Sequence, residues 1–136
     1  MAAADDMAGT SLLLIDLDHF SWINNNLGHD VGDRALVAVA AHLRALCPTG
    51  STITRFGGDE FVVWFPAPLS DLGDLYQALR SAKIMPSGTG DRRSSLRSSI
   101  GAITIRPGET AAKAIKRADD AMYEAKSSGG DRIHIA

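Results

Sequence analysis

A continuous apolar run near the start of the chain is the feature that most limits its fold. Leu12 to Ile15 and Leu17 are apolar, and the run ends in two acidic residues, Asp16 and Asp18. A strand of this composition is typically buried on both faces, so it needs other elements packed on each side of it. We therefore expect a central strand inside a layered fold.

The apolar periodicity along the rest of the chain predicts the other elements. Helical spacing predicts helices over residues 20–27, 31–46, 71–84 and 110–126. β-Branched and aromatic runs predict strands over residues 52–56, 61–65, 96–105 and 132–135, and two glycines between the first two favour a hairpin. This order predicts an α/β (α+β) fold, with a mixed central sheet, surrounding helices and a ferredoxin-like or palm-type split βαβ arrangement. We expect residues 1–10 to form a flexible tail and residues 11–136 to form one domain.

Composition excludes several classes of protein. With 136 residues, 45% hydrophobic and 22% charged, the chain is long and apolar enough for a folded core. The formal net charge of −2 does not favour binding to nucleic acid or to an anionic membrane surface. A single cysteine, no signal-peptide pattern and no apolar run long enough for a bilayer lead us to expect a cytoplasmic protein without membrane insertion.

Two acidic residues at the end of the predicted first strand form a candidate metal site. Asp16 and Asp18 stand on alternate positions, so their side chains project from one face. Such a pair suits a hard cation such as Mg²⁺, which takes oxygen ligands and often keeps phosphates as its other partners. Acidic residues also simply mark where a buried strand reaches solvent, so both interpretations stay open at this point.

The tip of the predicted hairpin carries a second acidic pair, Asp59 and Glu60, directly after Gly57 and Gly58. Glycine permits a sharp turn and the close approach of a ligand, although Gly and Asp are also ordinary turn residues. A split βαβ fold can bring this tip beside Asp16. Carboxylates from two neighbouring strands that hold metal ions over a triphosphate are typical of nucleotidyl transfer.

The segment between the two acidic sites could read a nucleobase. An aspartate such as Asp33 can accept hydrogen bonds from the N1–H and the exocyclic amine of guanine, and Asn24 could add a contact. Helix caps and loop residues are the alternative, which we favour for Asp30.

Three collinear blocks of the sequence resemble the GGDEF domain of diguanylate cyclases. The signature stands intact as Gly57-Gly58-Asp59-Glu60-Phe61 after Arg55-Phe56. The upstream block contains Asp16-Leu17-Asp18-His19-Phe20, Ile23-Asn24, Gly28-His29, Gly32-Asp33 and Leu36. The downstream block contains Ser99-Ile100-Gly101 and residues 117–126, so the resemblance runs from about residue 11 to the C-terminus.

The resemblance implies an activity and a set of site residues. Two GTP molecules, one on each subunit of a homodimer, are condensed into cyclic di-GMP with release of two pyrophosphates. A divalent metal, Mg²⁺ or Mn²⁺, is held by Asp16, the carbonyl of Leu17 and Asp59, and Glu60 assists catalysis. The implied substrate contacts are Phe20, Asn24, His29, Asp33, Gly58 and Lys126, of which Asn24 and Asp33 read the guanine and Lys126 binds the triphosphate.

The sequence departs from the family pattern in ways that affect this expectation. Gly130 stands where the family usually carries a basic residue, and the loss of a charged contact to phosphate costs roughly 1.5–3 kcal/mol. An arginine restored at this position is predicted to raise turnover. Arg132 could reach round to the same place, although as a strand residue it is expected to point elsewhere. An inhibitory Arg-x-x-Asp product site reads Thr49-Gly50-Ser51-Thr52 here, so that form of product inhibition should be absent.

The family also normally begins with a helix that this sequence lacks, so we expect a domain shortened at its N-terminal end. These departures leave a second hypothesis open, a catalytically weak or inactive GTP-binding module that acts through a partner.

Overall fold

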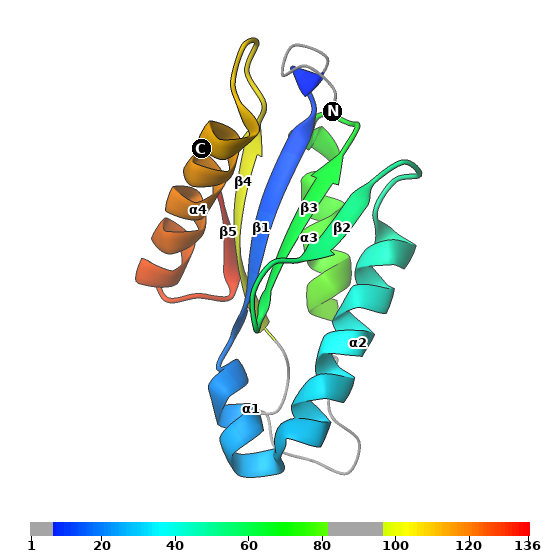
Figure 1. Cartoon of the computed structure of the whole chain (residues 1–136), viewed down its shortest axis with the longest axis vertical. Coiled ribbons are helices and arrows are strands. Elements are labelled where there is room, and N and C mark those ends of the chain that lie inside the picture. The colour runs from blue at the N-terminus through cyan, green and yellow to red at the C-terminus, as the bar shows by residue number, and fades with distance from the viewer. Residues whose placement is uncertain (1–6, 82–96) are drawn as a thin grey trace.

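The computed structural model describes residues 7–81 and 97–136 of the chain. Over these residues, five strands form one mixed sheet in the order β2-β3-β1-β4-β5 (Figure 1). The strands are β1 (Ser11–Asp18), β2 (Thr52–Arg55), β3 (Glu60–Phe65), β4 (Arg97–Thr104) and β5 (Arg132–Ile135). The helices are α1 (Phe20–Leu27), α2 (His29–Leu46), α3 (Leu72–Ser81) and α4 (Ala111–Ser127), with a 3₁₀ turn at Leu69–Asp71.

The apolar run that limits the fold is the central strand. β1 pairs antiparallel with β3 on one side and with β4 on the other. β2 pairs antiparallel with β3, and β5 adds to the other edge parallel to β4. β1 and β2 therefore run parallel with β3 between them, and β3 and β4 run parallel with β1 between them. This arrangement is the predicted split βαβ fold.

Alternate residues of β1 pack into two separate cores. Leu13, Ile15 and Leu17 face the larger core, to which α1, α2 and α3 contribute. Leu12 and Leu14 face the opposite core, which α4 closes. Burial of each such side chain stabilises the fold by about 1.5–3 kcal/mol, and this two-sided burial is the reason that the strand is apolar without a break from Leu12 to Ile15.

Helix α4 lies unusually close to β4. A Cβ atom at Gly101 would overlap backbone atoms of Ala118 and Met122, so only glycine allows this approach of helix to strand. The helix axis is therefore fixed over the sheet, and with it the position of the residues at the end of α4.

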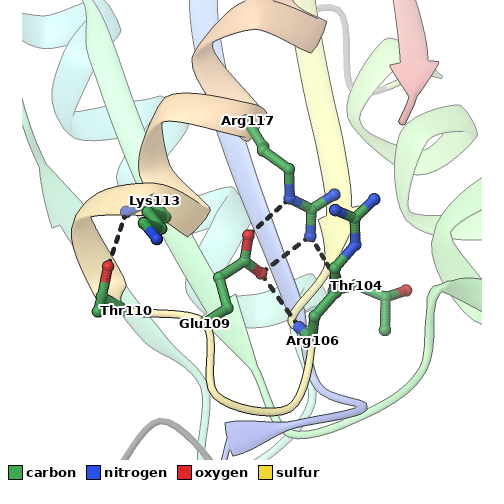
Figure 2. A network of polar contacts seen from close by, with 6 residues as sticks. All are labelled: Thr104, Arg106, Glu109, Thr110, Lys113 and Arg117. Atoms are coloured by element: carbon green, nitrogen blue, oxygen red, sulfur yellow. Dashed lines mark hydrogen bonds and ion pairs between the residues drawn. The ribbon is translucent and has the colours of Figure 1, made fainter.

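A polar network fixes the start of the same helix (Figure 2). The Arg117 guanidinium donates to both carboxylate oxygens of Glu109, at 2.6 and 2.9 Å, and to the Thr104 carbonyl at 2.8 Å. Glu109 also accepts from the backbone N–H of Arg106 at 3.1 Å, and the Thr110 hydroxyl caps the helix by accepting from the N–H of Lys113 at 3.2 Å. The connection from β4 to α4 is thus held by charge-assisted hydrogen bonds, which are stronger than neutral ones.

The predicted elements differ from the observed ones mainly at their ends. The second helix begins at His29, two residues before the predicted start, because Gly28 with a φ of 93° ends α1 and lets the chain turn directly into α2. The end predicted for α3 at residue 84, and the start predicted for β4 at residue 96, lie outside the described residues.

Part of the predicted N-terminal tail is attached to the sheet. Gly9 donates its N–H to the Ile105 carbonyl at 2.9 Å, and Ile105 donates to the Thr10 carbonyl at 2.9 Å. The Trp64 indole N–H donates to the Thr10 hydroxyl at 2.9 Å. Residues 7–10 thus extend the hydrogen bonding beyond β1, and residues 1–6 lie outside the described chain. No helix in the described ranges is both long enough and apolar enough to cross a membrane.

Candidate functional site

Four segments that are distant in the sequence meet at one end of the sheet. They are the end of β1, the tip of the β2–β3 hairpin, the start of α1 and the end of α4 (Figure 1). A pocket of about 360 Å³, here called the end pocket, opens between them. It is lined by Leu17, Asp18, His19, Phe20, Ser21, Asp59, Lys126, Gly129 and Gly130.

The hairpin tip is held firmly against β1. The N–H groups of Phe56 and Gly57 donate to the Glu60 carbonyl at 2.9 and 3.4 Å. The Arg55 guanidinium binds the carbonyls of Gly57 and Gly58 across the turn. The N–H of Leu17 donates to the Asp59 carbonyl at 3.1 Å, so Asp59 is fixed beside the end of the central strand.

Asp16 is a nearly buried carboxylate with one unused oxygen. Only 4% of the residue is exposed, and its Oδ2 forms an ion pair with the Lys126 ammonium. Its Oδ1 is buried and has no hydrogen-bond partner among the described residues. Because an unpaired buried acceptor costs about 1–3 kcal/mol, the orphaned oxygen fits a site for a cation.

The protein ligands for such a cation are few. Over residues 7–81 and 97–136, no group of three or more acidic, histidine or cysteine side chains is arranged to hold a metal.

Asp18 differs from Asp16 although both face the same side of the sheet. Its Oδ1 accepts from the Ser99 hydroxyl at 2.7 Å, and its Oδ2 accepts from the backbone N–H of Asp131 at 2.7 Å. Both oxygens therefore tie β1 to β4 and to the turn after α4. The interpretation of Asp16 and Asp18 as an equivalent metal-binding pair is not supported, because both oxygens of Asp18 already accept hydrogen bonds from within the protein.

The turn after α4 brings two glycines to the pocket wall. Gly130 donates its N–H to the Ala125 carbonyl at 3.0 Å, and Gly129 donates to the Lys126 carbonyl at 3.1 Å, which closes the end of the helix. Gly130 has a φ of 73°, and a Cβ there would lie 3.0 Å from Oδ2 of Asp18. The expectation that an arginine at position 130 raises turnover therefore needs revision, because that side chain would strain the backbone and crowd Asp18.

Arg132 reaches back to the same turn. Its Nε donates to the Gly130 carbonyl at 3.0 Å, and its Nη2 lies 3.0 Å from the position that a Cβ of Gly129 would occupy. The expectation that Arg132 points away is wrong, because the long side chain of this first residue of β5 bends back over Gly129 and Gly130, which have no side chains to block it. Its guanidinium thus lies directly beside two residues of the pocket wall.

The start of α1 lines the pocket, and among the described residues its N-terminus has no side-chain cap. His19 precedes the helix with a φ of 58°, and its side chain forms no capping hydrogen bond with the N-terminus of the helix. Backbone N–H groups at an uncapped helix start attract anions. His19 and Ser21, which sequence reasoning did not place in the site, line the pocket here; their adjacency to the Asp16-Leu17-Asp18 block was the available signal.

The residues assigned to guanine recognition lie on α1 and on the first turns of α2. Asn24 is half-buried, and a Cβ at Gly32 would overlap its side-chain oxygen and lie 3.2 Å from the Phe20 ring. Asp33 follows directly and is exposed. The structure thus brings Phe20, Asn24 and the start of α2 together. Of the predicted substrate contacts, Phe20 and Lys126 line the end pocket, whereas Asn24, His29, Asp33 and Gly58 do not.

Glu60 lies in register with Asp16 on the neighbouring strand. Partners in an antiparallel pair project to the same face, so Glu60 shares the α4 side of the sheet with Asp16. Burial raises the pKa of the Glu60 carboxyl above its usual value, and the nearby charges of Asp119 and Asp59 raise it further. The end of the sheet therefore concentrates negative charge, which a divalent cation would relieve.

Known proteins are similar to this chain in sequence and in fold. The profile of the family described as "Diguanylate cyclase, GGDEF domain" matches residues 1–132. Diguanylate cyclase DgcP of Pseudomonas aeruginosa is 37% identical over 127 residues, which are 92% of this chain and 19% of that protein. Diguanylate cyclase DgcM of Escherichia coli K12 is 38% identical over 127 residues, 93% of this chain and 30% of that protein. The chain thus spans less than a third of the length of either relative.

Solved structures agree with the sequence relatives. A microbial GGDEF domain studied for its interaction with cyclic di-GMP superposes with a TM-score of 0.83 at 32% identity, covering 99% of this chain and 81% of that chain. Diguanylate cyclase SiaD of Pseudomonas aeruginosa, solved with its activator SiaC, gives 0.82 at 32% identity, covering 94% and 50%. With a family profile matched over nearly the whole sequence and the fold shared in detail, this chain belongs to the GGDEF domain family.

Proposed function

We propose that this domain is a diguanylate cyclase that condenses two GTP molecules into cyclic di-GMP and two pyrophosphates. The observation that carries the proposal is the buried carboxylate of Asp16, whose unpaired Oδ1 lies at the end of the sheet where Asp59 is held against β1. The relatives named diguanylate cyclases support the same activity.

The acidic residues hold the metal and assist the attack. Asp16, the Leu17 carbonyl and Asp59 hold Mg²⁺ or Mn²⁺, which neutralises phosphate charge and lowers the pKa of the attacking hydroxyl. The 3′-hydroxyl of one GTP forms a bond to the α-phosphorus of the other, the bond to the β-phosphate oxygen breaks, and pyrophosphate leaves. Glu60 assists by accepting the hydroxyl proton, a role for which its raised pKa makes it a better base.

Positive groups around the end pocket bind the phosphates. Lys126 contributes a positive charge, and the uncapped N–H groups at the start of α1 contribute hydrogen-bond donors. Arg132, held beside Gly129 and Gly130, supplies a second positive side chain. The lack of a basic residue at position 130 is thus compensated in part.

The base lies toward α1 and α2. Asn24 and Asp33 read the guanine, because an aspartate accepts from two donors that adenine does not present together. Phe20, packed against Gly32, shapes this wall of the site, and His29 and Gly58 contribute exposed contacts to the bound nucleotide.

Each domain offers only half of a reaction centre, so the reaction takes place between two copies of the domain. Each copy presents one GTP to the other, and turnover should therefore rise more steeply than linearly with protein concentration. The residues at 49–52 lack the charged pair of the inhibitory product site, so the product should not inhibit the enzyme through that surface. We place the domain in the cytoplasm, where GTP is available.

The alternative function is a GTP-binding regulatory module with feeble or no turnover, which Gly130 favours. Incubation of concentrated protein with GTP and Mg²⁺ or Mn²⁺, followed by chromatography for cyclic di-GMP and pyrophosphate, separates the two. The Asp59→Ala variant serves as the control and should give no product. GTP binding without product supports the regulatory module, and product formation that survives Asp59→Ala contradicts the proposed metal site.

A further inference from the structure

Lys126 has two roles that exclude each other. Its ammonium is the ion-pair partner of Asp16, and its side chain also lines the end pocket. In the ion pair, the Asp16 side chain is 5% exposed and the Lys126 side chain is 43% exposed. One cation thus neutralises the metal-binding carboxylate while it stands at the edge of the space proposed for the phosphates.

The ammonium and a divalent cation compete for the same carboxylate. A metal bound to Asp16 would repel the ammonium at contact distance, and this repulsion is strong in a site with limited access to water. Asp18, the adjacent acidic residue on this face, cannot take over the ammonium easily, because Ser99 and Asp131 already occupy both of its oxygens. A polyphosphate in the end pocket offers the ammonium another partner.

We propose that Lys126 couples the binding of metal to the binding of nucleotide, so that the site accepts the metal–nucleotide complex and disfavours the free cation. This inference rests on the proposed function and specifies the form in which the substrate is bound. When phosphates enter, the ammonium leaves Asp16 for them, and Asp16 becomes available to the metal. By thermodynamic linkage, nucleotide tightens metal binding by the same factor as metal tightens nucleotide binding.

The surroundings of Lys126 permit this exchange without a change of fold. The residue is in the last turn of α4, whose axis is fixed by the contact at Gly101 and whose end is closed by Gly129 and Gly130. The lysine stem is flexible and its side chain is 43% exposed, so the ammonium can move from one partner to the other by side-chain rotation alone. The device therefore requires the movement of one side chain.

The test measures binding of Mn²⁺ alone, by electron paramagnetic resonance, to the wild type and to Lys126→Met. The variant keeps the apolar stem and removes the competing charge, so its Mn²⁺ affinity in the absence of nucleotide should be higher by about tenfold or more. Lys126→Gln is a second variant that keeps a hydrogen-bond donor for Asp16 Oδ2 and so is expected to fold even if Lys126→Met does not. Its Mn²⁺ affinity in the absence of nucleotide should also be higher than that of the wild type. Lys116→Met removes a charge from the exposed Lys116–Asp120 pair on the same helix and should leave Mn²⁺ affinity unchanged.

A second measurement tests the coupling itself. The Mn²⁺ affinity is measured again with a GTP analogue that cannot react, after correction for Mn²⁺ bound to the free analogue. The analogue should tighten Mn²⁺ binding to the wild type by a larger factor than to Lys126→Met. Unchanged or weaker binding of Mn²⁺ alone by both folded Lys126 variants, or an equal change in Lys116→Met, would overturn the inference. A wild type that binds no analogue even with Mn²⁺ would instead refute the proposed function, whatever the first measurement gives.

Discussion

The salt bridge between Glu109 and Arg117 gives a stability prediction whose size follows from the structure. The paired hydrogen bonds from Arg117, helped by the N–H of Arg106, lower the pKa of the Glu109 carboxyl from 4.5 to about 2. A difference of this size corresponds to an upper value of about 3 kcal/mol, at about 1.4 kcal/mol per pKa unit. The Glu109 side chain is only 8% exposed but Arg117 is 21% exposed, so screening by solvent reduces the contribution, and we expect about 2 kcal/mol.

The pH dependence follows from the direction of the shift. Because the pKa in the folded state lies below that in the unfolded state, the contribution is fully present above pH 4.5 and is lost as the pH falls toward about 2. The Glu109→Gln variant cannot ionise at this position. Its deficit in the free energy of unfolding should therefore be about 2 kcal/mol at pH 7 and should shrink toward zero near pH 2.

Urea unfolding monitored by circular dichroism at pH 7, 4 and 2.5 measures this deficit. Glu124→Gln, at an exposed position on α4, is the matched control and should change stability by less than about 0.5 kcal/mol. A deficit for Glu109→Gln that does not vary with pH would refute the reasoning, because it would show that packing and not charge stabilises this connection.

Three further predictions concern other parts of the molecule. Gly101→Ala should lower the free energy of unfolding, measured by urea titration, by about 1–3 kcal/mol, because its Cβ overlaps the α4 backbone. Gly73→Ala in α3 has open space around it and should raise the free energy of unfolding slightly. Glu60→Gln should raise the melting temperature at pH 7, because the raised pKa means that the charged carboxylate destabilises the folded state. This gain should vanish below pH 4.5, and a gain that stays constant with pH would contradict the raised pKa. Arg132→Gln should weaken binding of a GTP analogue roughly tenfold in calorimetry, with Arg44→Gln on α2 as a neutral control.

Local pattern was sufficient for the elements and for their order. The unbroken apolar run before Asp16 specifies a strand covered on both faces, and Gly57 and Gly58 between two strand-like runs specify the hairpin. The sequence therefore predicted that the hairpin tip lies beside the end of β1, as the structure shows. Helix boundaries were less accurate where a single glycine decides them. Gly28, with its positive φ, lets α2 begin directly at His29, although the apolar spacing begins later.

The partners of the site residues could not be inferred from local pattern. Ser99 and Asp131, which bind Asp18, are 81 and 113 residues away from it in the chain, and Lys126 is 110 residues from Asp16. Such contacts depend on how α4 and the following turn pack on the sheet. The same holds for Arg132, whose direction depends on the turn beside it and not on its place in a strand.

The contrast between Asp16 and Asp18 can be tested because their oxygens are used differently. In Asp18→Asn, the amide group that replaces one oxygen would face Ser99 or the Asp131 N–H, and we expect a loss of about 1–3 kcal/mol in the free energy of unfolding. In Asp16→Asn, the released Lys126 is 43% exposed and can be hydrated, while a buried charge with one unpaired oxygen is removed, so stability should change by less than about 1 kcal/mol.

Binding of metal should separate the same two variants in the opposite sense. Mn²⁺ with a GTP analogue should raise the melting temperature of the wild type and of Asp18→Asn, because Asp16 is intact in both. The same additions should leave the melting temperature of Asp16→Asn unchanged. If Asp18→Asn kept its stability but lost the response to Mn²⁺, Asp18 would be a metal ligand rather than an anchor for the turn after α4. In that case the carboxylate pair would act together, as two acidic residues on one face of a strand first suggest.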